Sequence, residues 1–305
     1  MTYHRKVIQI TAEDSPNVKY ALLQRSLGIS PDNEIVCPGV LTYEEYKVRR
    51  KLWDQIRQCI SLDARFYKGS ELLLYPPHWL VNARELDRGL LGKKRIALAI
   101  GIDPAEGGDK TAMSAVDEYG LIELVSQKTP DTSDITDLAI AFMKRHNVHP
   151  ERVYFDRGGG GKQHADRLRK MGYDVNTVAF GESVMMDPKR GLRLIEERIG
   201  NREERYSYFN RRAKMYGELS ELLDPSYGGF ALPEEYSELF QQMAPIPKTY
   251  REGRLYILPK SKKDAGSKEK TLTELIGHSP DELDSLVIAL HAMNHSELRI
   301  TAGAV

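Results

Sequence analysis

The feature that most constrains the fold is an apolar run that ends in a carboxylate, within Arg95–Thr111. Residues 96–102 are all apolar, a pattern typical of a strand covered on both faces. Pro104 would end such a strand because proline has no N–H to donate, and the glycines that follow permit a sharp turn. Since an unpaired buried carboxylate is costly, Asp103 is either a polar strand end or part of a functional site.

The composition narrows the class of protein. The chain has 305 residues, of which 41% are hydrophobic and 29% charged, as in a globular protein with one large domain or two ordinary ones. No stretch reaches the length of a membrane span, and the N-terminus lacks a signal-peptide pattern. The two cysteines, Cys37 and Cys59, form no CxxC pair, which indicates a reduced intracellular setting without a zinc motif. The 44 basic and 44 acidic residues balance, yet a neutral total does not exclude nucleic-acid binding.

Strand and helix patterns follow Asp103 in an order typical of a mixed α/β sheet. Residues 111–116 and 121–127 alternate between apolar and polar side chains around DEYG, which predicts a hairpin. A helix is expected over 133–146, then a strand over 152–155 that again ends in a carboxylate, Asp156. The strand over 152–155 is followed by four glycines, then by an expected helix over 162–171 and an expected strand over 175–180.

The later part of the chain is predicted to be largely helical. Residues 187–223 are helical and charged, and strands are expected over 230–234 and 254–258 on either side of a helix over 235–243. The last pattern is a helix within residues 277–294. Asp281 and Asp284 are three residues apart near its start, so they share one face.

These carboxylates predict a metal site. A sheet that begins with a hairpin and continues with parallel strands can bring the ends of its first and fourth strands together, and the last helix can pack across them. Several carboxylates would then repel one another unless cations are present, and hard oxygen ligands suit Mg²⁺ or Mn²⁺ rather than zinc. Two such ions about 4 Å apart can hydrolyse a phosphodiester. The alternative is a set of ordinary turn and cap acids; Asp281 in particular could simply favour the helix N-terminus.

Three segments resemble the nuclease motifs of the large terminases of tailed phages, which are RNase H/resolvase-like enzymes. They are GIDPAEGGDKTA, VYFDRGGGGKQHADRLRKMGYDVNTVAFG and HSPDELDSLVIALHA, and the resemblance covers Arg95–His295. It implies an RNase H-like mixed sheet flanked by helices over residues 93–305. By motif position it also implies that Asp103, Asp156 and Asp284 form the metal-binding core. Asp281 matches an auxiliary carboxylate of related resolvases, and Asp109 matches an accessory acid of some terminases.

The resemblance also implies a biological setting. Large terminases cut concatemeric double-stranded DNA during packaging, in the cytoplasm of an infected bacterium, and work with a portal protein and a small terminase subunit. Residues 1–92, with ITAEDSPN and PGVLTYEEY, resemble the end of a terminase ATPase domain and its linker, a smaller α/β or helical segment. No G-x-x-x-x-G-K-[ST] phosphate loop is present, so ATPase activity is not expected from this chain.

Basic residues form the predicted contact with DNA. A set that interleaves with tyrosines is expected to bind the DNA backbone in a salt-dependent way, unless it is a solvated loop. Its members are Lys248, Arg251, Arg254, Lys260, Lys262 and Lys263, and the same role is considered for Lys162, Arg211 and Arg212.

The main hypothesis is therefore an endonuclease that uses two Mg²⁺ or Mn²⁺ ions and has little sequence preference. Two alternatives stay open: a Holliday-junction-type resolvase, which also carries an Asp-x-x-Asp helix, and a catalytically silent DNA-packaging subunit.

Overall fold

The computed structural model describes residues 9–30, 34–53, 58–65, 73–105, 109–184, 208–252, 254–262 and 269–295. The chain forms two compact units, Met1–Ser70 and Glu71–Val305. The predicted boundary at residues 92 and 93 lies later in the chain. The difference arises because helix α4 (Pro77–Arg88) packs its buried Leu80 and Ala83 into the core of the second unit.

The elements in the described part of the first unit are all helices. Its elements are η1 (Ala12–Asp14), α1 (Pro16–Ser26), α2 (Tyr43–Leu52) and η2 (Gln58–Leu62). Val18 and Ala21 of α1 pack against Tyr43 and Tyr46 of α2 in a small core. Thr42 caps α2, since its side chain accepts a hydrogen bond from the Glu45 N–H at 3.2 Å.

The second unit contains the predicted mixed sheet, with five strands in the order β3-β2-β1-β4-β5. The strands are β1 (Ala99–Asp103), β2 (Lys110–Val116), β3 (Leu121–Lys128), β4 (Val153–Asp156) and β5 (Asn176–Val178). β2 and β3 form the predicted hairpin, and β1 pairs antiparallel with β2 and parallel with β4. The ends of β1 and β4 therefore meet at one edge of the sheet, as expected.

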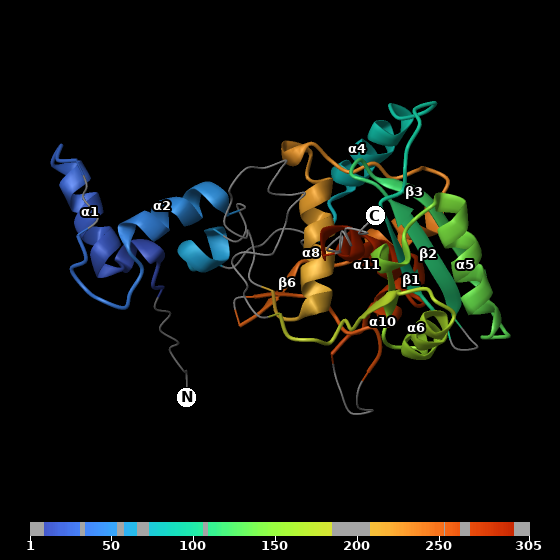
Figure 1. The fold of residues 1–305 in the computed structure, drawn as a ribbon. Helices are drawn as coiled ribbons and strands as arrows, with labels where there is room; N and C mark the ends of the chain where they lie inside the picture. Colours follow the sequence, from blue (N-terminus) through green and yellow to red (C-terminus); the bar gives the residue numbers. More distant parts are fainter. Residues whose placement is uncertain are drawn as a thin grey trace, which may run out of the picture. The chain divides into compact units, whose positions relative to one another are not determined.

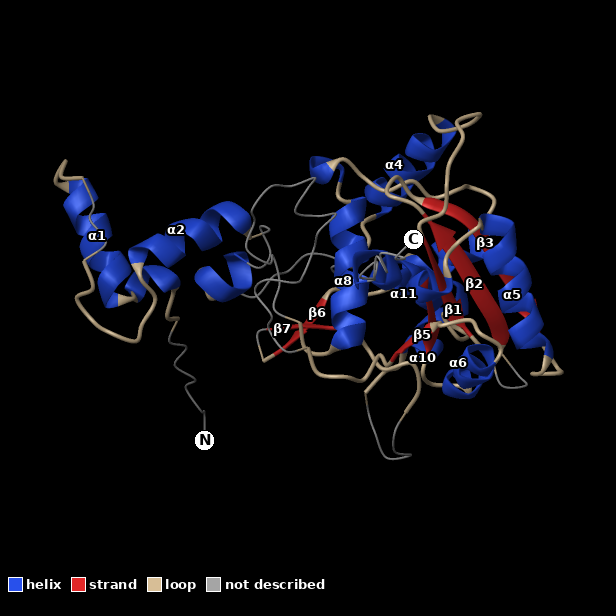
Figure 2. Ribbon diagram, viewed as in Figure 1, coloured by secondary structure: helices blue, strands red, loops and turns tan. Residues whose placement is uncertain are grey.

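Helices cover both faces of this sheet (Figure 1). α5 (Asp134–His146) and α6 (Gly161–Lys170) lie on one face, and α11 (Asp281–His295) lies on the other. The remaining described elements are η3 (Pro150–Arg152), α8 (Arg211–Leu223), η4 (Pro225–Tyr227), α9 (Ser237–Met243), α10 (Leu272–Ile276), and the strands β6 (Thr249–Arg251) and β7 (Arg254–Tyr256). β6 and β7 form a separate hairpin beside α8 (Figure 2).

Alternation along β1 decides which side chains meet α11. Ile100 and Ile102 belong to the core formed with α5 and α6, whereas Ala99 belongs to the core that contains α11. Successive side chains of a strand point to opposite faces, so Gly101 and Asp103 face α11. A Cβ at Gly101 would lie 2.2 Å from the backbone nitrogen of Ala289, which shows how closely α11 packs on β1.

Three expected elements differ from the structure. β1 begins at Ala99, and Ile96 is 64% exposed, so the apolar run is only partly a strand. Residues 230–234 form no strand; Ala231 makes a single bridge to Gly120. Of the helical segment expected over 187–223, residues 187–207 lie outside the described part, and α8 occupies residues 211–223. None of the helices in the described ranges has both the length and the apolar character needed to cross a membrane.

Candidate active site

Asp103 and Asp156 lie at the ends of two adjacent parallel strands. Ile102 of β1 is opposite Phe155 of β4, so the carboxylate that follows each of them leaves the sheet at the same edge. Both also point toward α11. Tyr154, two residues before Asp156, packs edge-on against His291 of α11 with ring centroids 5.6 Å apart, and alternation places Asp156 on that same face.

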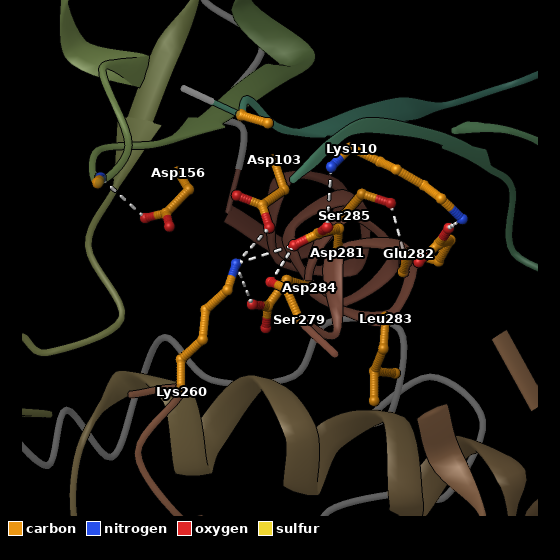
Figure 3. A network of polar contacts seen from close by, with 12 residues as sticks. Asp103, Lys110, Asp156, Lys260, Ser279, Asp281, Glu282, Leu283, Asp284 and Ser285 are labelled. Atoms are coloured by element: carbon orange, nitrogen blue, oxygen red, sulfur yellow. Dashed lines mark hydrogen bonds and ion pairs between the residues drawn. The ribbon is translucent and has the colours of Figure 1, made fainter. Parts of the chain in front are cut away.

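The first turn of α11 adds two further carboxylates, Asp281 and Asp284 (Figure 3). Asp281 Oδ2 accepts a hydrogen bond from the Lys110 backbone N–H at 3.2 Å, and Asp281 Oδ1 accepts one from the Ser279 hydroxyl. Asp284 is fully buried and Asp281 is 5% exposed. The predicted set of four carboxylates is therefore gathered at one edge of the sheet.

A lysine lies among these carboxylates. Lys260 Nζ is 3.1 Å from Asp103 Oδ2, 3.1 Å from Asp281 Oδ1 and 3.5 Å from Asp284 Oδ2 (Figure 3). Burial works against the charged form of this lysine, but Asp103, Asp284 and Asp281 outweigh it and raise its pKa. The sequence predicted that Lys260 would contact DNA; in the structure its ammonium is the counter-ion of the acidic cluster.

Burial also changes the ionisation of the acids. It raises the pKa of Asp103 well above its ordinary value, against the lowering effect of Lys260, and the neighbouring Asp284 and Asp156 raise it further. The pKa of Asp156 is raised first by burial and then by Asp284, while the Gly158 N–H that bonds its Oδ1 at 3.2 Å opposes the shift. A divalent cation would favour the ionised forms of both groups.

Two side chains of helix α8 bind the Asp284 carboxylate. Arg212 Nη1 lies 3.0 Å from Asp284 Oδ1, and the Tyr216 hydroxyl donates to the same oxygen at 2.6 Å. The Arg212 guanidinium stacks on the Phe180 ring, 4.0 Å from its centroid, and the residue is 8% exposed. This buried position argues against the predicted contact of Arg212 with DNA phosphates. Tyr216 was not among the predicted site residues.

The acidic cluster opens into a cavity of about 320 Å³, which Asp103, Asp156 and Asp281 line together with Asp109 and Lys260. Asp109 is exposed, in keeping with an accessory position at the opening. Among the described residues, no three His, Cys, Asp or Glu side chains already stand in a ready metal-binding arrangement. The donors nevertheless suit Mg²⁺ or Mn²⁺, because they are carboxylate oxygens and three of them already surround a cation, the Lys260 ammonium.

The other predicted DNA contacts lie mostly in ion pairs with acids. The pairs are Arg251 with Glu269 (3.1 Å), Arg254 with Glu252 (2.5 Å), Lys262 with Glu274 (2.8 Å) and Arg211 with Glu182 (3.1 Å). Lys162 is exposed on α6, Lys248 is half-buried, and Lys263 lies outside the described residues. Salt-dependent DNA binding by this set stays a prediction.

Glu282 of α11, like Tyr216 of α8, was not among the predicted site residues. Glu282 is 2% exposed; it accepts a hydrogen bond from the Ser126 hydroxyl at 2.5 Å and pairs with Lys110 Nζ at 3.4 Å. The Lys110 backbone N–H also donates to Asp281, so Lys110 connects β2 to α11 through two neighbouring acids. The available signal was the acidic start of the helix, DELD, in which Glu282 directly follows Asp281.

Comparison with solved structures identifies the fold. The K428A mutant gp2c of the large terminase subunit of bacteriophage Sf6, with calcium, matches at a TM-score of 0.56 and 16% identity, covering 72% of this chain and 99% of that one. The nuclease domain of the same subunit, gp2, matches at a TM-score of 0.54 and 18% identity, with the same coverage. The K428A mutant nuclease domain with manganese and beta-thujaplicinol matches at 0.53 and 17%, again with this coverage.

The chain has the fold of a phage terminase nuclease domain. The mixed five-stranded sheet with flanking helices is thus the predicted RNase H-like arrangement. No protein-family model matches the chain, and no curated protein sequence matches it. At 16–18% identity the terminase likeness is one of fold, so activity has to be argued from the site itself.

Proposed function

We propose that this protein is a Mg²⁺- or Mn²⁺-dependent endonuclease that cuts double-stranded DNA concatemers during phage genome packaging. The observation that carries the proposal is that Asp103, Asp156, Asp281 and Asp284 gather from two strand ends and one helix, with three of the four in contact with the Lys260 ammonium. The terminase nuclease fold supports it, since neighbours of that fold were solved with manganese.

Asp103, Asp156 and Asp284 would hold the metal ions, with Asp281 beside them and Asp109 at the opening. Two bound ions supply Lewis-acid activation of a water and neutralise charge at the leaving oxygen. The chain itself orients the carboxylates: β1 and β4 fix Asp103 and Asp156, while the Lys110 N–H fixes Asp281. Until a divalent cation binds, Lys260 offsets part of the negative charge.

The proposal extends to the setting of the reaction. Contacts with the phosphates of the DNA backbone do not depend on the base sequence. We expect Arg251, Arg254 and Lys262 to make such contacts by leaving their acidic partners and binding phosphates. The portal protein and the small terminase subunit are the proposed partners, in the cytoplasm of the infected cell. Residues 1–92 are proposed to be the end of an ATPase domain and its linker, without ATPase activity of their own.

The test is cleavage of plasmid and linear duplex DNA with Mg²⁺ or Mn²⁺. Asp156→Asn should reduce cutting by about 100-fold or more, because it removes a charged ligand at the strand end. The matched control is Asp166→Asn, an acid on α6 that pairs with Arg169 at 2.8 Å and should leave the rate unchanged.

Different outcomes separate the alternatives. If Asp156→Asn protein cuts at the wild-type rate, the site assignment is wrong. Faster cutting of four-way junctions than of linear duplex would favour a resolvase. DNA binding without metal-dependent cutting would favour a catalytically silent packaging subunit.

A further inference from the structure

Asp284 differs from the other acids of the site in how completely the protein surrounds it. It is 0% exposed, whereas Asp103 is 4% exposed and Asp281 is 5% exposed. A buried carboxylate is stable only if its oxygens are hydrogen-bonded, so the partners of Asp284 decide which oxygen remains for a ligand.

Two donors converge on one oxygen of this carboxylate. Oδ1 receives the Tyr216 hydroxyl at 2.6 Å and Arg212 Nη1 at 3.0 Å. Oδ2 lies at 3.5 Å from the same arginine nitrogen and at 3.5 Å from Lys260 Nζ, so its contacts are longer. Oδ1 is therefore occupied by hydrogen bonds from α8, and Oδ2 faces the Lys260 ammonium.

The two donors are themselves fixed. The Arg212 guanidinium lies on the Phe180 ring at 4.0 Å, a cation–π contact in a buried setting. The backbone carbonyl of Tyr216 accepts the buried Tyr75 hydroxyl at 3.1 Å, which holds this turn of α8 in place. Donors that cannot move impose one orientation on the carboxylate they bind.

We infer that Arg212 and Tyr216 are positioning residues that orient Asp284 so that it presents Oδ2 to a divalent cation. The inference rests on the proposed metal-dependent function and assigns two residues of α8 a part in it. Such outer partners of a ligand typically change metal affinity or activity by 10- to 100-fold when they are removed.

A substitution at Tyr216 can test the orientation of Asp284 without changing the charge of the site. Arg212 carries a positive charge that opposes a bound cation, so its loss has two opposing effects. Tyr216→Phe removes one hydroxyl and no charge, and it leaves Arg212 on the same oxygen. We expect the dissociation constant for Mn²⁺, measured without DNA by titration calorimetry, to rise about 10-fold in this variant. The Mn²⁺ concentration that half-saturates DNA cutting should rise by the same factor.

The matched control is Tyr208→Phe. Tyr208 is also a buried tyrosine, 7% exposed, but its hydroxyl donates to Glu221 at 3.3 Å. Mn²⁺ affinity should stay at the wild-type value in this variant. If Tyr216→Phe protein does not fold, as judged by circular dichroism, Arg212→Lys replaces it. That variant keeps the charge but loses the planar group that stacks on Phe180, so Mn²⁺ affinity should again fall.

The outcomes distinguish this inference from the proposed function. Wild-type protein that neither binds Mn²⁺ nor cuts DNA would reject both. Wild-type protein that does both, with Tyr216→Phe binding Mn²⁺ equally well, would reject only the positioning role. An equal loss in Tyr208→Phe would also reject it, because a general packing effect would then account for the change.

Discussion

Lys260 shows how a single residue can stabilise a cluster that would otherwise repel itself. Its ammonium contacts Asp103, Asp281 and Asp284 within 3.5 Å, and its side chain is 28% exposed. Each of these carboxylates is nearly or completely buried. Removing one partner of such a group leaves uncompensated buried charge, which is strongly destabilising.

Lys260→Met is therefore expected to lower the free energy of unfolding without metal by roughly 3 kcal/mol. Mn²⁺ should then stabilise the variant more than the wild type, because the ion replaces the missing charge. Urea unfolding with and without Mn²⁺ measures both effects. Lys262→Met is the control, since Lys262 is 40% exposed and pairs only at the surface with Glu274. Equal stability of Lys260→Met and wild type without metal would contradict the counter-ion role.

At the scale of elements, the site depends on how closely α11 lies on β1. The closest approach is at Gly101, where a Cβ would come within 2.2 Å of Ser285 O and of Ala289 N. The hydrogen bond of 2.7 Å between Ser114 and Ser285 holds α11 to β2 as well. Any side chain at residue 101 must push the helix away from the strand.

Gly101→Ala should destabilise the second unit by about 3 kcal/mol, the upper part of the range for overpacking, because backbone atoms rather than a flexible side chain block the methyl group. The shift of α11 should also reduce metal-dependent cutting. Gly181→Ala is the control, since a Cβ there meets nothing within 4 Å. Urea unfolding compares the two, and similar values would show that α11 adjusts at little cost.

The other end of α11 contains a pair of stacked, largely buried histidines. His291 is buried, and its ring stacks on His295 with centroids 4.1 Å apart. Arg211 and Lys214 of α8 lie nearby and oppose further positive charge. Burial, followed by His295 and then by Arg211 and Lys214, lowers the pKa of His291 well below its usual range, and burial lowers that of His295 to about 4.

Both histidines are therefore neutral in the folded chain at pH values where the unfolded chain takes up protons. The free energy of unfolding should fall as the pH drops from about 6.5 toward 4, by up to about 3 kcal/mol for His295. His295→Asn should flatten this dependence, whereas His149→Asn should not, because His149 is 64% exposed. Unfolding curves at several pH values test this, and an unchanged slope in His295→Asn would contradict it.

At the scale of the molecule, the extent of the second unit can be measured directly. Leu74, Tyr75, Leu80 and Ala83 are buried in its main core, and the backbone N–H of Leu74 bonds the Ile246 carbonyl at 2.8 Å. These residues precede the boundary that the sequence indicated at residues 92 and 93.

A fragment of residues 71–305 should unfold cooperatively at nearly the midpoint of this unit in the full chain. A fragment of residues 93–305 loses four buried core residues and the Tyr75 hydroxyl, so it should be destabilised by more than about 5 kcal/mol or be insoluble. Thermal unfolding of both fragments decides the point. Equal stability would place the boundary where the sequence indicated.

The sequence by itself determined the sheet and the positions of its carboxylates. Apolar runs and helical spacing are local properties, so they predicted that Asp103 and Asp156 end strands and that Asp281 and Asp284 share one face of a helix. The hairpin of β2 and β3 followed from the same kind of pattern. Site residues that stand at the end of a strand or in the first turn of a helix could be predicted in this way.

Only the tertiary structure decided the direction in which the side chains of Lys260 and Arg212 point. Lys260 and Arg212 lie in basic segments that look like a surface for DNA, yet both turn inward to buried acids. No local pattern carries that information, because a long side chain can point either way and its direction depends on which charges lie within reach after packing. The pairing of Tyr216 with Asp284, 68 residues apart, has the same origin: it exists only once α8 has packed against α11.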